Sequence, residues 1–363
     1  MNQIASNMQK LNIPWVSLLS VGILAGIYAT FKVLFGQHHF LAANDTIIWT
    51  LPISTYVFFA ITSTGMGLLG SLPKLLGVEA LNRWARRLTF MAIVTLLGAF
   101  ISIGLELGAV THMIYLMFSP NFTSPIWWMG VLYSLELALL IYKFIVEGRE
   151  GKTPPALSAA SAIVGVIAVM VLGSVFGLAE SRPVYFGAYM PIYTLSMSLV
   201  AAWATISVYD AISPIGGAEP TAGMGRTLKA TLILSTAVAF ARLVLAMANT
   251  KEAFSEVAGI WPTLGLLLAL LLMLPAASKV SRGIRGFAAG LTLVSVFTLT
   301  VSIIVAGQAM PIGPKAENAP AILSYAPNIG EVLVFIFSAS VVLLLYHLGD
   351  RLLQIDPKIK DSQ

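Results

Sequence analysis

The sequence predicts an all-α polytopic membrane protein with about ten transmembrane helices, and three observations lead to this prediction. Hydrophobic residues make up 58% of the 363-residue chain. Charged residues make up only 10%, whereas a soluble domain carries about 25%. The apolar residues gather in repeated stretches of about 20 residues or more, the length at which a helix spans a bilayer.

Ten apolar segments lie along the chain. They cover about residues 13–36, 47–72, 88–118, 126–146, 158–179, 190–213, 227–248, 257–277, 284–307 and 329–349. The fifth and ninth are rich in glycine and serine, so eight or nine spans are the alternative. No cleavage-site pattern follows the first segment, which we expect to be retained as a helix.

The link after the fourth segment predicts a boundary between two helical bundles. Pro154 and Pro155 interrupt helical continuity there. We therefore expect an N-terminal four-helix bundle in residues 1–153. A second bundle with additional spans would occupy residues 154–363.

Basic residues in the connections predict the orientation, because cytoplasmic connections carry an excess of lysine and arginine. With ten helices, one side receives Lys10, Lys74, Arg83, Arg86, Arg87, Arg149, Lys152, Arg226, Lys229, Lys279, Arg282, Arg285, Arg351, Lys358 and Lys360. The opposite connections hold only Arg182, Lys251 and Lys315, with Lys32 near the end of the first segment. Both termini are therefore predicted to be cytoplasmic. The net charge of +5 is scattered over short connections, so we expect membrane lipid and no nucleic acid as a partner.

Cysteine and histidine usage limits the redox centres that this chain can hold. It has no cysteine, which removes disulfides and Cys-ligated iron–sulfur or zinc sites. The four histidines are His38, His39, His112 and His347, and the last lies far from the others. One haem between His112 and His38 or His39 is geometrically allowed, but a two-haem pathway is not. We expect no haem and no metal in this chain.

The apolar hairpin from Leu88 to Ile141 carries ionisable groups where a bilayer disfavours them. Glu106 and His112 lie in its first arm, about 9 Å apart along a helix axis. Tyr133 and Glu136 are three residues apart in the second arm, on one helix face. Ionisable residues at membrane depth suggest a ligand site or a proton path.

These groups predict a quinone pocket at the outer interface. We expect Tyr28, His38, His39, His112 and Tyr133 to bind the headgroup, whose two oxygens need hydrogen-bond donors. Glu106, His112 and Glu136 would receive the protons released by quinol oxidation, since imidazole titrates near neutral pH. The alternative is that Glu106 and Glu136 only form hydrogen bonds between helices, and that His38 and His39 are water-exposed residues at the membrane interface.

Further ionisable residues extend the predicted proton path of Glu106 and Glu136. Arg242 is the only arginine deep inside an apolar segment. Asp210 lies near the inner end of the sixth segment. Glu331, at the start of the last segment, is expected to be a helix-start acid favoured by the helix dipole.

Four stretches resemble the NrfD family, the membrane subunits of polysulfide reductase and related complexes. They are VGILAGIYATFKVLFG, WWMGVLYSLELALL, SRPVYFGAYMPIYTLSMSLVAA and YAPNIGEVLVFIFSASVVLLLYHL. The third is the most telling, with Arg182 and Pro183 before an aromatic run and Pro191 opening a helix.

The resemblance implies a subunit of a bacterial or archaeal cytoplasmic membrane that binds menaquinone or ubiquinone near the outer face. It also implies a ferredoxin-like iron–sulfur partner on that face, connected to a molybdopterin oxidoreductase or a multihaem cytochrome c. Such a subunit is not catalytic alone. A proton-coupled secondary transporter that uses Glu106, Glu136 and Arg242 is the first alternative, and a structural anchor for a redox partner is the second.

Overall fold

The computed structural model describes residues 12–35, 40–78, 81–82, 84–107, 114–182, 184, 186–212, 222–249, 259–275, 280–313, 323–353 and 355. All regular structure within these ranges is helical. The helices are α2 (Ile13–Leu34), α3 (Leu51–Leu69), α4 (Leu72–Leu76), α5 (Ala85–Glu106), α6 (Tyr115–Phe118), α7 (Pro125–Glu150), α8 (Pro155–Gly177), α9 (Met190–Ile212), α10 (Ala222–Asn249), α12 (Ile260–Leu272), α13 (Arg282–Ala309) and α14 (Ile329–Leu352).

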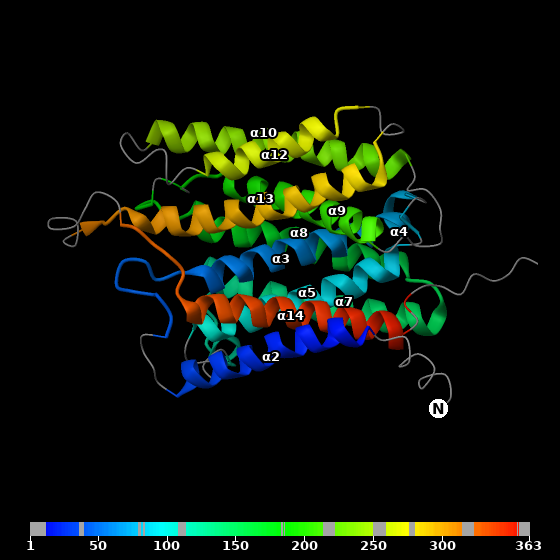
Figure 1. The fold of residues 1–363 in the computed structure, drawn as a ribbon, viewed down its shortest axis with the longest axis horizontal. Helices are drawn as coiled ribbons and strands as arrows, with labels where there is room; N and C mark the ends of the chain where they lie inside the picture. The colour runs from blue at the N-terminus through cyan, green and yellow to red at the C-terminus, as the bar shows by residue number, and fades with distance from the viewer. Residues whose placement is uncertain are drawn as a thin grey trace, which may run out of the picture.

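The number of membrane-spanning helices agrees with the prediction. Among the described residues, nine helices are long and apolar enough to cross a membrane, with α3 continuing through α4, and α12 is a further, shorter apolar helix. Consecutive long helices run in alternating directions, and α2 begins at the end of the bundle where α14 ends (Figure 1). The prediction of an all-helical, multi-pass membrane protein is confirmed. We call the end with the start of α2 the inner end, following the orientation that the basic residues predict.

Local sequence signals set several helix starts. Ser124 precedes α7, and its side chain accepts a hydrogen bond from the Trp127 amide, while Pro125 takes the first helical position. Ser281 caps α13 in the same way. Asn328 and Glu331 form a capping box at the start of α14.

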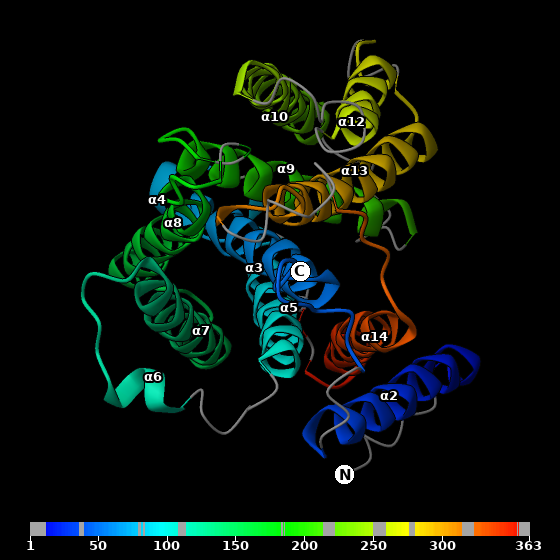
Figure 2. The same cartoon turned by 90° about the vertical axis from the view of Figure 1, so that its left-hand side faces the viewer.

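The long helices form two groups of four. In the first group α3 packs against α5 and α8, and α7 packs against the same two helices, so α3 and α7 stand at opposite corners (Figure 2). The second group contains α9, α10, α12 and α13, and α9 also packs against α3 and α8. The predicted domain boundary after residue 153 stays a prediction. The helix that follows this boundary, α8, packs against α3 and α7 of the first group.

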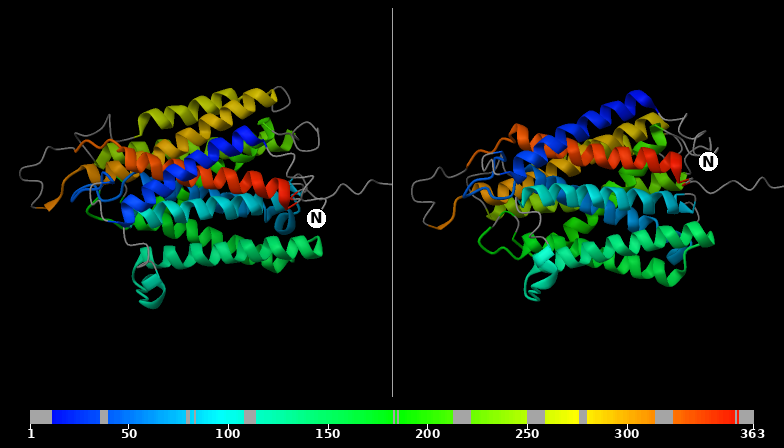
Figure 3. Two further views of the ribbon diagram at one scale, coloured as in Figure 1. Left: turned by 60° about the horizontal axis from the view of Figure 1, so that its bottom comes forward. Right: turned by 90° about the horizontal axis from the view of Figure 1, so that it is seen from below.

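Two elements lie outside these groups. The helices α2 and α14 pack against each other, and α14 also packs against α5. The short helix α6 lies beside the start of α7, outside the long helices (Figure 3).

Close helix approaches depend on glycine, which has no side chain to hold backbones apart. A Cβ atom at Gly65 of α3 would lie 2.0 Å from the Ser198 carbonyl oxygen of α9. At Gly26 of α2 it would lie 2.0 Å from the Phe337 ring of α14. The first contact joins the two four-helix groups, and the second joins α2 to α14.

Candidate functional site

The interior of the first four-helix group contains buried polar residues from its two opposite corners. Glu136 of α7 is only 1% exposed, and its Oε2 accepts a hydrogen bond of 3.0 Å from the Thr64 hydroxyl of α3. Tyr133, one turn before Glu136, is completely buried with its ring edge-to-face against Tyr56 of α3 at 6.2 Å. A Cβ atom at Gly165 of α8 would lie 3.2 Å from Glu136 Oε1. The glycine therefore leaves room for the carboxyl group on the bundle axis.

Glu106 ends α5 at the outer side and binds the start of α3. Its Oε1 accepts hydrogen bonds from the Thr50 amide at 3.0 Å and from the Thr50 hydroxyl at 2.8 Å. Within the part of the chain that the structure describes, no hydrogen-bond partner reaches Oε2, which is buried. One oxygen of Glu106 thus supports the fold, and the other is available to hold a proton or to bind a ligand.

Neighbouring amides at the start of α3 are bound by side chains from distant parts of the sequence. Gln308 Oε1 accepts from the amides of Ile48 and Trp49, each at 2.9 Å. The Tyr325 hydroxyl accepts from the Leu51 amide at 2.9 Å. The first amides of a helix have no acceptor within the helix, so these side chains complete the outer end of α3.

Glu331 belongs to the same outer network. Its Oε1 accepts from the Ala42 amide at 2.9 Å, and its Oε2 accepts from the Tyr325 hydroxyl at 2.6 Å and from the Asn328 amide at 3.3 Å. Glu331 is the expected helix-start acid, and it is also fully buried and interacts electrostatically with Glu106. Burial and the hydrogen bond to Glu331 raise the pKa of Tyr325 well above its ordinary range, so this phenol stays protonated as a donor.

The structure places the two predicted quinone ligands that it describes, Tyr28 and Tyr133, in different surroundings. Tyr28 is 53% exposed on α2, beside the Phe40 ring at 6.4 Å and the Lys32 ammonium at 5.6 Å. Tyr133 lies instead inside the bundle. The other predicted ligands, His38, His39 and His112, lie outside the described residues.

Asp210 and Arg242, the remaining predicted proton-path residues, belong to the second four-helix group. Asp210 forms a buried ion pair with Arg285 of α13 at 3.0 Å, and Arg282 lies 3.6 Å away. Arg242 of α10 is fully buried and interacts electrostatically with Tyr193. These two residues are therefore separate from the axis that holds Glu136.

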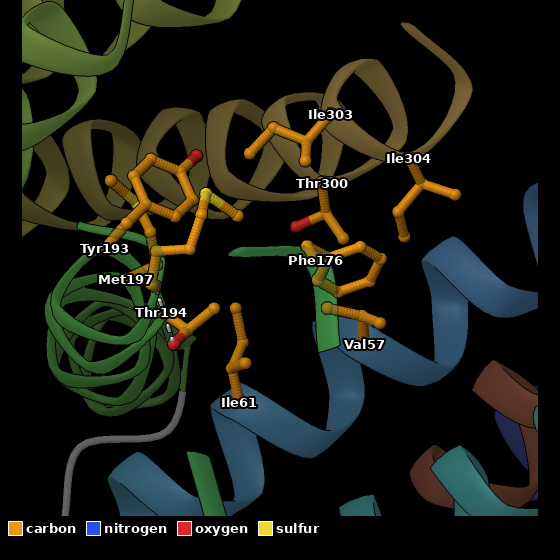
Figure 4. A pocket seen from close by; sticks show the side chains of 10 residues that line it. Val57, Ile61, Phe176, Tyr193, Thr194, Met197, Thr300, Ile303 and Ile304 are labelled. Carbon is orange, nitrogen blue, oxygen red and sulfur yellow. Dashed lines mark hydrogen bonds between the residues drawn. The ribbon is translucent and has the colours of Figure 1, made fainter. Parts of the chain in front are cut away.

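A cavity of about 20 Å³ lies where α3, α8, α9 and α13 meet. Its walls include Phe176, Met197 and the hydroxyl-bearing side chains of Tyr193, Thr194 and Thr300 (Figure 4). The Tyr193 hydroxyl is buried and has no hydrogen-bond partner in the described ranges. The volume suits about one water molecule and is too small for a quinone headgroup.

Sequence reasoning missed several buried polar residues. Lys143 of α7 donates a 2.8 Å hydrogen bond to the hydroxyl of Ser71, the residue before α4. Lys143 lies two helical turns after Glu136 inside an apolar segment. That position could have identified it as a buried lysine. Arg87 of α5 binds Asp350 of α14 and the Tyr209 hydroxyl of α9. That arginine sits at the start of its segment, where the sequence suggested only an orientation signal.

The described residues contain no group of three or more His, Cys, Asp or Glu side chains that could hold a metal ion. In comparisons with known proteins, the family model described as "Polysulphide reductase, NrfD" matches residues 39–312. The match covers about three quarters of the chain and leaves α2 and α14 outside. A search of curated proteins found no match.

Proposed function

This chain belongs to the NrfD polysulphide reductase family of membrane subunits of quinone-linked oxidoreductases, and from this premise we propose that it connects the quinone pool to an extracytoplasmic iron–sulfur subunit. Within that role it oxidises quinol, or reduces quinone, as part of a respiratory complex. The observation that carries the proposal is the pair of buried carboxyl groups, Glu106 and Glu136, in one membrane-embedded bundle. Ionisable groups are costly inside a membrane, so their presence there indicates a ligand site or a proton path.

The quinone site of this proposal is the outer end of the first four-helix group, around Glu106. The buried Oε2 of Glu106, which has no hydrogen-bond partner among the residues that the structure describes, supports this location. Tyr28, His38, His39, His112 and Tyr133 are the proposed headgroup ligands. Menaquinone and ubiquinone have the same two oxygens for such donors, so both are suitable substrates.

Quinol oxidation releases two protons and two electrons, and the chain must separate them. In the proposed mechanism His112 accepts a proton from the quinol hydroxyl and Glu106 passes it toward the outer solution. Glu136 accepts protons deeper on the bundle axis, and Asp210 and Arg242 extend the proton path in the second helix group.

The electrons go to a ferredoxin-like iron–sulfur subunit docked on the outer face. The chain has no cysteine to hold such a cluster itself, so the cluster belongs to another subunit. That partner exchanges electrons with a molybdopterin oxidoreductase or a multihaem cytochrome c. The complex would lie in a bacterial or archaeal cytoplasmic membrane.

Titration of the purified chain with a quinol analogue tests the proposal. We expect saturable quenching of tryptophan fluorescence, because Trp127 and Trp128 begin α7 at the outer end. His112→Ala should weaken binding, because it removes a proposed headgroup donor, whereas Glu150→Gln, at the exposed inner end of α7, should not. Quenching that never saturates would refute quinone binding and favour a transporter or a structural anchor.

A further inference from the structure

The inner half of the first four-helix group contains a lysine with no assigned role. Lys143 of α7 is 1% exposed, although it lies in a helix that crosses the membrane. Its Nζ atom donates a hydrogen bond of 2.8 Å to Ser71 Oγ, and Ser71 in turn donates to the Gly67 carbonyl at 2.9 Å. The amine is therefore held on the bundle axis and does not extend to the water at the inner end.

The contact between Lys143 and Ser71 repeats the contact between Glu136 and Thr64. Glu136 and Lys143 are seven residues apart on α7, and Ser71, between the end of α3 and the start of α4, lies seven residues after Thr64 of α3. Seven residues are two helical turns, or about 10.5 Å along the axis. The bundle thus presents one buried acid and one buried base at successive levels, the acid bonded to a hydroxyl of α3 and the base to a hydroxyl between α3 and α4.

Lys143 makes fewer hydrogen bonds than we expect of a buried cation whose only role is to stabilise the fold. A lysine ammonium has three N–H donors, and among the described residues only Ser71 accepts a hydrogen bond from Lys143. Arg87, at the same end of the protein, binds the Asp350 carboxylate and the hydroxyls of Tyr209 and Tyr346. Arginine stays charged in proteins, whereas a lysine amine can lose and regain a proton.

An acid connects Lys143 to the inner end. Glu147, one turn further along α7, interacts electrostatically with Lys143. Glu147 is only half-buried, so water reaches part of it, while its buried Oε2 has no hydrogen-bond partner in the described part of the chain. The order from the inner end along α7 is therefore Glu147, Lys143 and Glu136.

We propose that Lys143 is the inner proton-binding residue of a path along the α3/α5/α7/α8 axis, receiving protons through Glu147 and supplying Glu136. This inference rests on the proposed quinone-linked function, because electron transfer at the outer end is what would drive proton uptake. A proton from the inner solution binds Glu147 and then the Lys143 amine. Between the two levels, a Cβ atom at Gly67 would lie 3.2 Å from the Leu140 side chain and 3.9 Å from Glu136 Oε1. A rotation of the Leu140 side chain admits the water that carries the proton across two turns to the Glu136 carboxylate. No electrons move in these steps.

The test uses the complete respiratory complex in sealed vesicles, energised with a short-chain quinol. Proton uptake at the inner end is followed with a pH-sensitive dye, and quinol oxidation is measured in the same vesicles. The variants are Lys143→Met, which removes the titratable amine, and Lys143→Arg, which keeps a charge that cannot be released. Lys152→Met, at an exposed lysine in the link after α7, is the matched control.

We expect proton uptake per electron to fall about tenfold or more in both Lys143 variants, which is the scale of losing one proton-transfer group. The control should match the unaltered protein. A purely structural lysine predicts normal uptake in Lys143→Arg, and that result would overturn the inference. If Lys143→Met does not assemble, Lys143→Arg alone decides.

The two proposals fail in distinguishable ways. An unaltered complex that oxidises no quinol refutes the proposed function. An unaltered complex that oxidises quinol but takes up no protons at the inner end refutes only the role of Lys143.

Discussion

Replacing Glu106 by glutamine separates the two tasks that its carboxyl group has in the structure. Glutamine keeps an oxygen that can accept both hydrogen bonds from Thr50. It places an NH₂ group at the position of Oε2, which is buried and has no hydrogen-bond partner within the described ranges. An unsatisfied buried donor costs about 1–3 kcal/mol, so we expect the free energy of unfolding to fall by that amount and the complex still to assemble.

The effect on electron transfer should be larger than this stability cost suggests, because an amide cannot receive a proton. We expect quinol-linked electron transfer to fall about tenfold or more, which corresponds to about 1.4 kcal/mol of activation free energy. His112→Ala should instead weaken quinone binding, since it removes a proposed headgroup donor. The two variants therefore affect different steps of one reaction.

The assay compares quinol oxidation by the assembled complex with partner-enzyme activity from an artificial donor that bypasses the membrane subunit. Glu150→Gln, an exposed acid at the inner end of α7, is the control. Glu331→Gln is unsuitable as a control because the Glu331 carboxylate accepts three hydrogen bonds in the outer network. Unchanged quinol oxidation in both Glu106→Gln and His112→Ala, with the complex intact, would refute the reasoning.

Three further predictions test the fold and its orientation. Tyr325→Phe leaves the Leu51 amide without its acceptor and removes the shorter of the two hydrogen bonds to Glu331 Oε2. The stability should fall by about 1–3 kcal/mol, measured as a lower midpoint of thermal unfolding in detergent; an unchanged midpoint would contradict this. Gly65→Val forces a side chain against a carbonyl oxygen of α9 and should cost about 1–3 kcal/mol or more by overpacking, whereas Gly290→Val, in open space, should be tolerated in the same melting assay. A reporter fused to the C-terminal tail should be active only in a cytoplasmic assay, and a signal from the opposite side would reverse the orientation.

Much of the fold could be predicted from sequence because helix formation in a membrane is a local matter. Every backbone amide and carbonyl must find a partner where no water is present, and a helix supplies those partners within the segment itself. Apolar stretches of sufficient length therefore indicate the number of spans, and residues such as Ser124 and Pro125 indicate where a helix begins. The same logic identified Glu106 and Glu136 as unusual, since their cost depends only on membrane depth.

What those residues contact was decided only by the tertiary structure. Glu106 binds Thr50, which lies 56 residues earlier, and Tyr325 binds Leu51 across 274 residues. The pairing of α2 with α14 and the meeting of Lys143 with Ser71 on one axis likewise depend on which helices pack together. Helix packing is selected by the shapes of whole surfaces, such as the contact at Gly65, and hydropathy along the chain carries little information about it. Hydropathy and residue type along the chain therefore predict charged residues within a helical membrane protein, and the packing of distant helices selects the partners of those residues.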